Sequence, residues 1–354
     1  MSFNTAIFGI PGMGKSQGAR RDIMSLVGSF RLKHPAILFL DGPGETVEMI
    51  VGDLCAAGHE KSIDYEELNS RDGKRIGTTL LRPTGNRVTD ELLVEQFLQP
   101  LFGQRGMASG TSTPFIFKYA EAAACVMMGL PPLPINAILS LFHLGDPQRE
   151  WMLRNTTEQA AAWTFLDAEL RAMKPRFNPV QYEIETGGAE RLFKPLKSTV
   201  IYEASVGDYD WKEFLKRGGI HLRNGKGVKR EIRRFDSILA INHLANAAWE
   251  LFNETGKKHD YYIYVEEGGA DQIYTPQFLD NMRTARKNGW HSRFIQQSPA
   301  DMGEVFPQFI SLVDRVECYR MTSGIEEMAK ILANPTWDSH RVHNEKEVTY
   351  TAGY

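Results

Sequence analysis

Residues 9–16 have the sequence GIPGMGKS, and this stretch decides the fold of the chain. It follows a short, mostly apolar run at 3–8 that has the character of a buried strand. Its three glycines let the backbone wrap around an anion and aim several N–H groups inward, because no Cβ stands in the way. The segment 17–29 has the spacing of an amphipathic helix, whose positive end would face that anion. The stretch therefore predicts a strand, an anion-binding loop and a helix in succession.

The pattern G-x-x-x-x-G-K-[ST] is the phosphate-binding loop of nucleoside triphosphatases, and here it predicts a site for ATP and Mg²⁺. Lys15 is expected to reach the β- and γ-phosphates, while the Ser16 hydroxyl is expected to ligate Mg²⁺. The predicted nucleotide-binding residues are Gly9, Gly12, Gly14, Lys15, Ser16 and Gln17.

Composition narrows the class of protein. The chain has 354 residues, of which 42% are apolar and 24% charged, as in a soluble globular protein. Its net charge of −3 excludes a globally basic nucleic-acid coat, so any nucleic acid would meet a local basic surface. The three cysteines are far apart and lack metal-ligand spacing, which suits a reduced compartment. No apolar stretch approaches about 20 residues. We expect a cytoplasmic protein, or a virion-associated one if viral, without an integral membrane segment.

The order of elements predicts an α/β fold with a mostly parallel sheet flanked by helices. The buried run 36–40, a turn at 41–45 and a helix-like run at 46–57 continue the alternation that opens the chain. Helical spacing then dominates from Thr89 to about Lys174 and predicts an inserted, mostly helical subdomain. The expected divisions are a first core part at 1–88, an insertion at 89–195, a second core part at 196–334 and an extended tail at 335–354.

Further elements are expected on both sides of the insertion. A helix at 237–252 is predicted with Asp236 as its N-cap, and a helix at 277–288 with Gly289 as its C-cap. The further strands are predicted at 78–82, 200–202, 219–222, 261–265, 291–296 and 313–319.

Hydrolysis of ATP also needs an acidic group on a nearby strand, which holds the Mg²⁺ shell and orients or deprotonates water. The run 261–265 ends in Glu266 and Glu267, and parallel strands deliver such side chains to the edge where the loop lies. Glu266 is predicted for the Mg²⁺ shell and Glu267 for activating the water. Asp41, which also ends an apolar strand, is the rival acid, and a strand that ends in solvated acids is the alternative.

Four segments, taken in order, resemble motifs of the HerA/FtsK superfamily of ring-forming P-loop DNA motors. The first is the loop at 9–16. The second, LDGPGE at 40–45, is similar to an Asp-Pro-Lys-Gly-Glu turn. The third, VEE at 265–267, stands where the family has a strand ending in Asp-Glu. The fourth joins RTARKNG at 283–289 to IQQSP at 295–299, and resembles an Arg-Lys-x-Gly … Thr-Gln-Ser-Pro block.

The resemblance covers roughly residues 3–325 and is strongest to conjugative coupling and type IV secretion ATPases, with viral DNA-packaging ATPases as a related branch. It implies a RecA-like fold and a homo-oligomeric ring, expected to be a hexamer, with ATP hydrolysed between subunits. Two residues depart from the family pattern. Glu266 replaces an Asp, and Pro43 replaces a Lys. The chain also lacks the membrane helices of anchored coupling proteins.

The resemblance also implies roles for single residues. Gln297 would sense the γ-phosphate through its amide, which both donates and accepts. Arg286 would act as an arginine finger on a neighbouring subunit's phosphate, with Arg283, one turn earlier, as the alternate. The bland alternatives are a solvated loop glutamine and helix-surface arginines. Together with Lys15 and Glu267, Gln297 and Arg286 complete the predicted catalytic set.

The clearest basic run lies at 223–230 and contains two glycines, which suits a loop that follows nucleic-acid phosphates. Its candidate DNA contacts are Arg223, Lys226, Lys229 and Arg230, continuing to Arg233 and Arg234. A solvated charge run is the alternative.

The leading hypothesis is an ATP- and Mg²⁺-dependent ring motor that moves DNA, in viral genome packaging or in DNA transfer. The second is a secretion or assembly ATPase of the type IV kind that handles protein cargo. The third is a nucleotide-binding switch without hydrolysis, against which the intact Lys15, Ser16 and Glu267 argue.

Overall fold

The structure, a computed structural model, divides into two compact units. One comprises Met1–Lys74 with Asp210–Tyr354, and the other comprises Arg75–Tyr209. The residues that the structure describes are 4–29, 35–69, 77, 80–81, 87–106, 114–131, 133–156, 179–198, 207–319, 321, 328 and 341–342. The second unit interrupts the first in sequence, and the predicted insertion at 89–195 falls within its limits.

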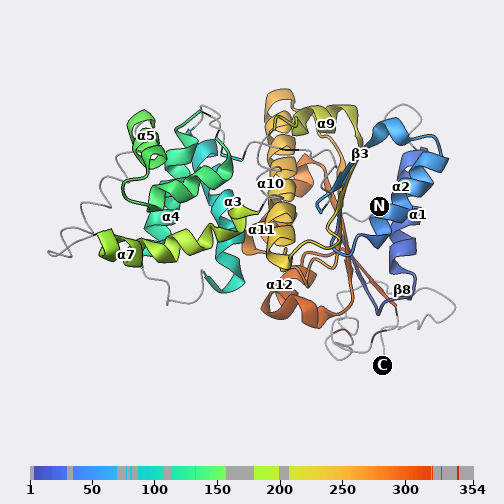
Figure 1. Ribbon diagram of the computed structural model, residues 1–354. Helices are drawn as coiled ribbons and strands as arrows, with labels where there is room; N and C mark the ends of the chain where they lie inside the picture. The colour runs from blue at the N-terminus through green and yellow to red at the C-terminus, as the bar shows by residue number, and fades with distance from the viewer. Residues whose placement is uncertain are drawn as a thin grey trace. The chain divides into compact units, whose positions relative to one another are not determined.

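The first unit is built on a parallel sheet (Figure 1). Its strands are β1 (Asn4–Phe8), β2 (Ala36–Asp41), β3 (Ile63–Glu67), β4 (Gly219–Asn224), β5 (Tyr261–Glu266), β6 (Trp290–Gln296), β7 (Arg315–Cys318) and β8 (Arg341–Val342). Among the described residues the strand order is β3-β4-β2-β5-β6-β1-β7-β8, and every recorded pairing is parallel. The predicted fold class, a mostly parallel α/β sheet with a helical insertion, is confirmed.

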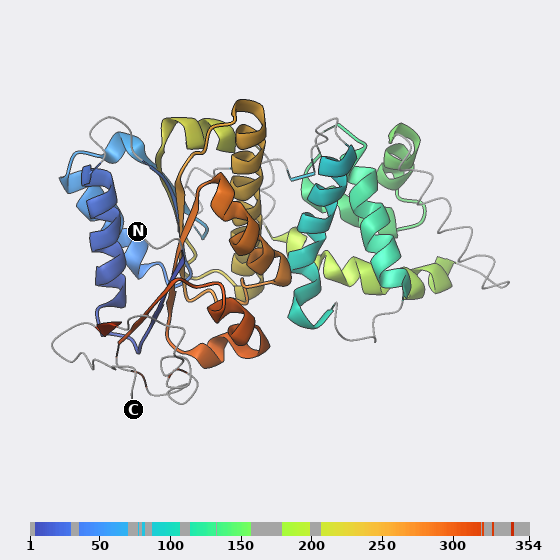
Figure 2. The same ribbon diagram turned by 180° about the vertical axis from the view of Figure 1, so that it is seen from behind.

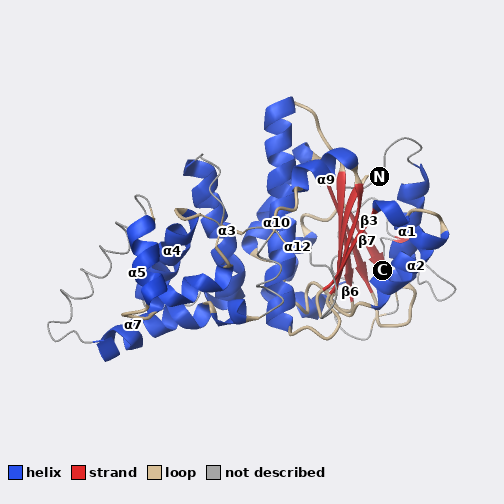
Figure 3. Cartoon of the chain, turned by 45° about the horizontal axis from the view of Figure 1, so that its top comes forward, coloured by secondary structure: helices blue, strands red, loops and turns tan. Residues whose placement is uncertain are grey.

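Helices cover both faces of this sheet, as Figure 3 shows with the strands seen nearly edge-on. One face carries α1 (Lys15–Ser29) and α2 (Glu45–Ala56). The helices that cover the other face are α9 (Trp211–Arg217), α10 (Arg230–Thr255), α11 (Pro276–Thr284) and α12 (Phe306–Ile310). Short 3₁₀ turns complete the unit at η1 (Glu60–Ser62), η4 (Ala285–Asn288) and η5 (Pro299–Val305).

The strand sequences explain why they lie in the centre. β2 (AILFLD) and β5 (YYIYVE) are buried along their whole length, so they read as continuous apolar runs rather than alternating ones. On the face of α1 and α2, branched residues of the sheet meet the apolar sides of both helices, and Phe39 stacks on Tyr264 at 5.7 Å. On the other face the packing is aromatic, and the rings of Tyr274, Phe294 and Phe309 all contact one another at 4.9–5.5 Å. Burial on both faces fixes the position of the sheet. It thereby also fixes the carboxyl ends of the strands, where the site lies.

Most predicted elements are present within two or three residues of their expected limits. The helix predicted at 277–288 is α11 followed by η4, and Gly289 closes it in the left-handed region with φ 103°. The strand predicted at 200–202 lies outside the described residues, and of the one predicted at 78–82 only Leu80 and Leu81 are described. Of the tail at 335–354, the described residues Arg341–Val342 form β8 beside β7.

The start of the long helix α10 was predicted wrongly. The helix begins at Arg230 with Lys229 as its N-cap residue, so Asp236 lies within the second turn rather than at the end. The Asp236 carboxylate is instead bound to Arg223 of β4, 2.5 Å away. An aspartate suited to cap a helix is thus used to neutralise a buried arginine, which sequence spacing alone does not reveal.

The second unit is helical where it is described. Its helices are α3 (Arg87–Gly106), α4 (Pro114–Met128), α5 (Pro147–Asn155) and α7 (Pro179–Leu192), with 3₁₀ turns η2 (Ile135–Phe142) and η3 (Lys194–Lys197). α4 packs against both α3 and α7, and Figure 2 shows these helices from behind. Phe193, directly after α7, packs against α3 and η2, with its ring 6.3 Å from Phe97 and 5.7 Å from Phe142. Among the helices of the described residues, none combines the length and the apolar character needed to cross a membrane.

Candidate nucleotide site

The loop between β1 and α1 has the backbone that the sequence predicts. Gly12 and Gly14 have φ angles of 79° and 87°, in the left-handed region that glycine adopts without steric cost. A Cβ built on either residue would meet no atom within 4 Å, so the space above the loop is open. The N–H of Gly9 donates to the Gln296 carbonyl of β6 at 3.2 Å and anchors the start of the loop. Since α1 begins at Lys15, its unpaired N–H groups point into this space.

Lys15 lies over the loop rather than in solvent. Its ammonium donates to the Gly9 carbonyl and, at 3.0 Å, to the Ile10 carbonyl. Burial lowers the pKa of Lys15, and the nearby carboxylates of Glu266 and Glu267 oppose that change. The side chain is thus held at the mouth of the loop, where a phosphate can replace the carbonyls as its partner.

The acidic strand meets the phosphate loop across one intervening strand. β6 lies between β1 and β5, and at the edge of the sheet the Ser16 hydroxyl donates to Glu266 Oε1 at 2.7 Å. Thr46 also forms a hydrogen bond with the Glu266 carboxylate, which lowers the pKa of Glu266. Burial has the larger and opposite effect, so the pKa of Glu266 is raised. Glu266 Oε2 is buried and finds no hydrogen-bond partner within the described parts of the chain. Sequence reasoning identified Ser16 and Glu266 and missed Thr46, which no motif marks.

Glu267 follows directly and has an unusual backbone. Its φ is 56°, a left-handed conformation that costs a non-glycine residue about 1–3 kcal/mol. Its N–H donates to the Ile295 carbonyl at 2.8 Å, and its carboxylate accepts from the amide of Gln297. The structure therefore brings Gln297, which directly follows β6, into contact with the residue predicted to activate water.

Asp41, the rival acid, is turned away from the loop. Its carboxylate accepts from the N–H groups of Gly44 and Val47, each at 2.8 Å, and so binds the amino end of α2. Asp41 is the register partner of Glu266 on the adjacent strand. Burial, and next the charge of Glu266, raise the pKa of Asp41 to about 7. The geometry therefore favours Glu266 over Asp41 as the group that faces the loop.

A cavity of about 330 Å³ opens above the phosphate loop. It is lined by every predicted loop residue from Gly12 to Gln17 except Met13, and by Glu266 and Glu267. Residues that the sequence did not predict complete it from the amino end of α2, namely Pro43, Glu45, Thr46 and Met49. The strand order and the α2 position, rather than any pattern in the sequence, place them there.

The donor set fits Mg²⁺. This ion takes one or two protein oxygen ligands together with substrate phosphates and water, and does not need a cage of protein ligands. Among the described residues there is no cluster of three His, Cys, Asp or Glu side chains suited to a metal. The Ser16 hydroxyl and the Glu266 carboxylate, one of whose oxygens is buried without a partner, supply the hard oxygen ligands that Mg²⁺ requires.

Arg286 lies at the amino ends of the strands, whereas the phosphate loop lies at their carboxyl ends. It belongs to η4, which precedes β6, whereas Gln297 follows that strand. Its guanidinium bonds the Asp314 carboxylate at 2.9 Å and the Leu312 carbonyl at 3.0 Å. Arg286 therefore cannot reach the phosphate loop of its own chain, and Arg283 is exposed on the preceding helix. Any contact of either arginine with a phosphate has to involve another subunit.

The predicted basic loop is smaller than expected. Arg223 belongs to β4, is 5% exposed and is bound to Asp236, so the prediction that it contacts DNA is wrong. A strand residue with its charge neutralised inside the protein cannot meet a polyanion. The exposed cations of the run are Lys226, Lys229 and Arg230, and Lys226 pairs with Glu48 of α2 at 3.0 Å.

Comparison with known proteins supports the fold. No model of a protein family matches the sequence, and no curated protein matches it. Among solved structures, the chain is similar to the unbound bacterial conjugative coupling protein TrwBdeltaN70, with a TM-score of 0.63 and 11% identity over 98% of this chain and 76% of that one.

Two further structures of this coupling protein match equally well. The plasmid coupling protein TrwB in complex with ADP and Mg²⁺ has a TM-score of 0.64 and 11% identity over 97% of this chain and 76% of that one. TrwB in complex with the non-hydrolysable ATP analogue ADPNP has a TM-score of 0.64 and 10% identity over 96% and 76%. The resemblance to the conjugative coupling branch is thus confirmed for the fold.

Proposed function

We propose that this protein hydrolyses ATP and uses the energy to move DNA, as a subunit of a ring. The observation that carries the proposal is the bond of 2.7 Å between Ser16 and Glu266, which joins the phosphate loop to the acidic strand across β6. A glycine turn with no nucleotide would not need a buried carboxylate at its side. The fold shared with a coupling protein whose structures contain ADP, Mg²⁺ and ADPNP supports the same reading.

The residues divide the work by position. Mg²⁺, when bound with ATP, would neutralise phosphate charge and align the β- and γ-phosphates. Ser16 and Glu266 would hold it. Lys15 would leave the carbonyls of the loop and bind the phosphates, where its charge offsets the charge that develops during transfer. The open N–H groups of the loop and of α1 would bind the remaining oxygens.

Glu267 would position and deprotonate the attacking water, since its carboxylate lies beside the cavity. Its amide partner, Gln297, gives the site a way to respond to the γ-phosphate. Once that phosphate accepts from the Gln297 amide, the Glu267 carboxylate is released toward the water. The proton then passes from water to Glu267 as the water oxygen attacks phosphorus in line with the leaving oxygen.

The proposal is tested by the steady-state rate of ATP hydrolysis against protein concentration, with and without long double-stranded DNA. A specific rate that rises with concentration and again with DNA is expected for a ring motor. A rate that ignores DNA would overturn the DNA part and favour protein cargo. A protein that binds ATP but never hydrolyses it would overturn the enzyme.

The predicted arginine finger can be tested by mixing variants. Arg286→Ala should lower the DNA-stimulated rate by about 1,000-fold or more, because a finger is worth that much in phosphoryl transfer. Lys15→Ala, with an impaired site and an intact finger, should keep only about 0.1–1% of the rate alone. Mixing the two should restore part of the rate at interfaces that join an intact site to an intact finger.

The exposed neighbour Lys287 provides the matched control, since Lys287→Ala removes a charge from the same turn. Full activity of Arg286→Ala would exclude Arg286, and the same mixing experiment with Arg283→Ala would then examine the alternate arginine. Loss of the surface pair with Asp314 should change stability by only about 0–1 kcal/mol.

A further inference from the structure

The turn that follows β5 is held in a costly conformation. Glu267 and Gln272 both have φ near 56°, although neither is glycine. Inside the turn, the Asp271 N–H donates to the Glu267 carbonyl at 3.1 Å, and the Gly269 N–H donates to the Gln296 side chain at 3.0 Å. Such a backbone persists only where surrounding contacts enforce it. The position of the Glu267 carboxylate therefore depends on what holds the Glu267–Asp271 turn.

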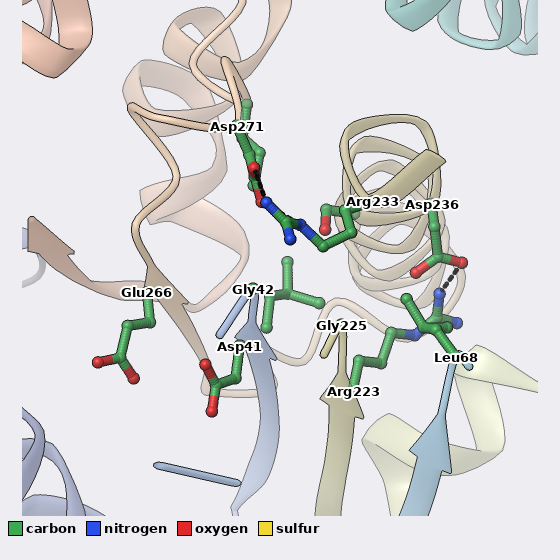
Figure 4. Close-up of a pocket in the computed structure, with 12 residues that line it drawn as sticks. Asp41, Gly42, Leu68, Arg223, Gly225, Arg233, Asp236, Glu266 and Asp271 are labelled. Carbon is green, nitrogen blue, oxygen red and sulfur yellow. Dashed lines mark hydrogen bonds and ion pairs between the residues drawn. The ribbon is translucent and has the colours of Figure 1, made fainter. Parts of the chain in front are cut away.

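One side chain that holds the turn comes from α10. Arg233 binds Asp271 through two parallel bonds, Nε to Oδ2 at 3.0 Å and Nη2 to Oδ1 at 2.6 Å. The Asp271 side chain is 4% exposed and that of Arg233 is 25% exposed. Two-pronged arginine–carboxylate pairs fix orientation as well as distance. Figure 4 shows the Arg233 guanidinium directed at Asp271, with Gly42 and Gly225 beneath it.

Arg233 also contacts the exposed basic loop. Its third nitrogen, Nη1, donates to the Val228 carbonyl at 3.3 Å. A Cβ built on Gly225 would lie 2.6 Å from Arg233 Cδ, so the loop backbone rests directly on this side chain. Val228 lies between Lys226 and Lys229, which are both exposed, although Lys226 pairs with Glu48 at 3.0 Å. A single side chain thus joins the loop that carries the exposed cations to the turn that carries Glu267.

The same ion pair touches the turn after β2. A Cβ built on Gly42 would lie 3.0 Å from Asp271 Oδ2 and 3.6 Å from Arg233 Nε. The Gly225 N–H donates to the Asp41 carbonyl at 2.8 Å, which fastens the start of the basic loop to the same strand end. Three segments therefore converge on one salt bridge, and movement of the loop cannot leave the pair undisturbed.

We propose that Arg233 and Asp271 are a positioning pair, through which a polyanion on the loop of Lys226 and Lys229 sets the orientation of Glu267 for hydrolysis. The inference rests on the proposed function and deepens it, because it names how DNA would change the rate. Neither residue lines the cavity of the candidate nucleotide site. They act through the backbone bond between Asp271 and Glu267.

The test compares kcat and KM for ATP, with and without long double-stranded DNA, in Arg233→Lys and Asp271→Asn. Arg233→Lys keeps the charge and loses the two-pronged geometry, while Asp271→Asn keeps the shape and loses the charge. In each variant we expect the DNA-stimulated kcat to fall about 10- to 100-fold, because a displacement of about 1 Å at a reacting group has such an effect. KM should change less than about 2-fold, since no contact with ATP is lost.

The matched control is Lys212→Ala. Lys212 pairs with Glu250 and Glu254 near the opposite end of the same helix, at 2.6 Å and 2.8 Å. The substitution removes an ion pair from α10 and changes no contact of the Glu267–Asp271 turn, so stimulation by DNA should be unchanged. An equal loss of stimulation in Lys212→Ala would mean that any weakening of the helix has this effect, and would overturn the positioning role.

Two glycine variants keep the test decisive if the charge variants unfold. Gly225→Ala pushes a methyl group against Arg233 and leaves every charge in place, and Gly52→Ala adds the same group on α2, where a Cβ meets no atom within 4 Å. Gly225→Ala should lose stimulation and Gly52→Ala should keep it. Equal stimulation in both would overturn the proposal.

Removing the loop charges shows whether the loop and the pair act together. The double variant Lys226→Ala/Lys229→Ala should lose stimulation, and adding Arg233→Lys should lower it no further, because residues of one unit are not additive. Additive losses would overturn the coupling. A wild-type enzyme that hydrolyses ATP but ignores DNA overturns the coupling and the DNA part of the proposed function while ATP hydrolysis stands, whereas a wild-type protein without hydrolysis removes the proposed function and the coupling together.

Discussion

Two groups of charged and polar side chains lie at the same sheet and differ in which neighbours compensate their charges. The open site consists of Lys15, Ser16, Glu266 and Glu267 and borders a cavity of about 330 Å³. The closed cluster consists of Glu66, His221, Arg223 and Asp236 on β3, β4 and α10. In the closed cluster the charges face one another, with Arg223 2.5 Å from Asp236 and 3.6 Å from Glu66.

The difference separates structural from functional charge. Burial of a charge is costly, so it persists where a partner compensates it or where function requires it. The closed cluster has opposite charges in contact, and Trp211 covers His221 with its ring 5.2 Å away. The open site has two carboxylates of like charge, a lysine bound to carbonyls and space beside them. Of the two groups, the open site is the one that borders a cavity of about 330 Å³, in which a group from outside can compensate its charge.

The largest expected effect concerns the closed cluster. Arg223→Ala should lower the free energy of unfolding by about 3–5 kcal/mol, because it leaves the carboxylates of Glu66 and Asp236 buried without their cation. Urea unfolding, followed by circular dichroism, measures this change. Lys212→Ala, which breaks a more exposed pair, is the control and should cost about 0–1 kcal/mol. A loss below about 1 kcal/mol in Arg223→Ala would mean that the cluster is not a structural unit.

At the open site we expect a large loss of activity and little loss of stability. Lys15→Ala should reduce the rate of ATP hydrolysis by about 100- to 1,000-fold, the usual effect of losing one group that stabilises developing charge. Its free energy of unfolding should stay within about 1 kcal/mol of wild type, since burial already disfavours the ammonium. Hydrolysis assays and urea unfolding on the same preparation check both. A variant that loses stability as Arg223→Ala does would erase the distinction between the two groups.

The smallest expected effect is a dependence of stability on pH. Burial lowers the pKa of His221, so the folded protein keeps this ring neutral while the unfolded chain takes up a proton below about pH 6.5. The unfolded state then binds more protons, and stability falls as pH falls below that value. Between pH 7 and pH 5, wild type should therefore lose more stability than His221→Gln. Urea titrations at both pH values measure the difference, and equal losses would contradict a neutral His221.

The sequence predicted those parts of the site that local chemistry determines. Gly12, Gly14, Lys15 and Ser16 form a contiguous motif whose residue types are each required for binding phosphate. The acidic pair ends a strongly apolar strand, so its arrival at the same edge follows from parallel topology. The strands themselves were predictable because burial on both faces leaves an unbroken apolar run.

Contacts that depend on tertiary structure were not predictable. The contact of Thr46 with Glu266 and the cap that Asp41 makes on α2 both depend on how α2 packs against the sheet. The spacing of residues in the sequence does not indicate that packing. Arg223 and Asp236 each had a sound local interpretation, as a DNA contact and a helix cap. Both interpretations were wrong because the two residues neutralise each other across β4 and α10. Charges that pair over a distance in sequence are where local rules fail.

The central claim is that the open site is a hydrolytic ATP site in which Glu267 acts on the water. The most direct measurement is Mg²⁺-ATP affinity together with single-turnover hydrolysis, for wild type and Glu267→Gln. The account predicts binding within about 2-fold of wild type and hydrolysis slower by about 100-fold or more, since loss of a general base costs at least that much. A Glu267→Gln protein that binds Mg²⁺-ATP and hydrolyses it at the wild-type rate would contradict the account.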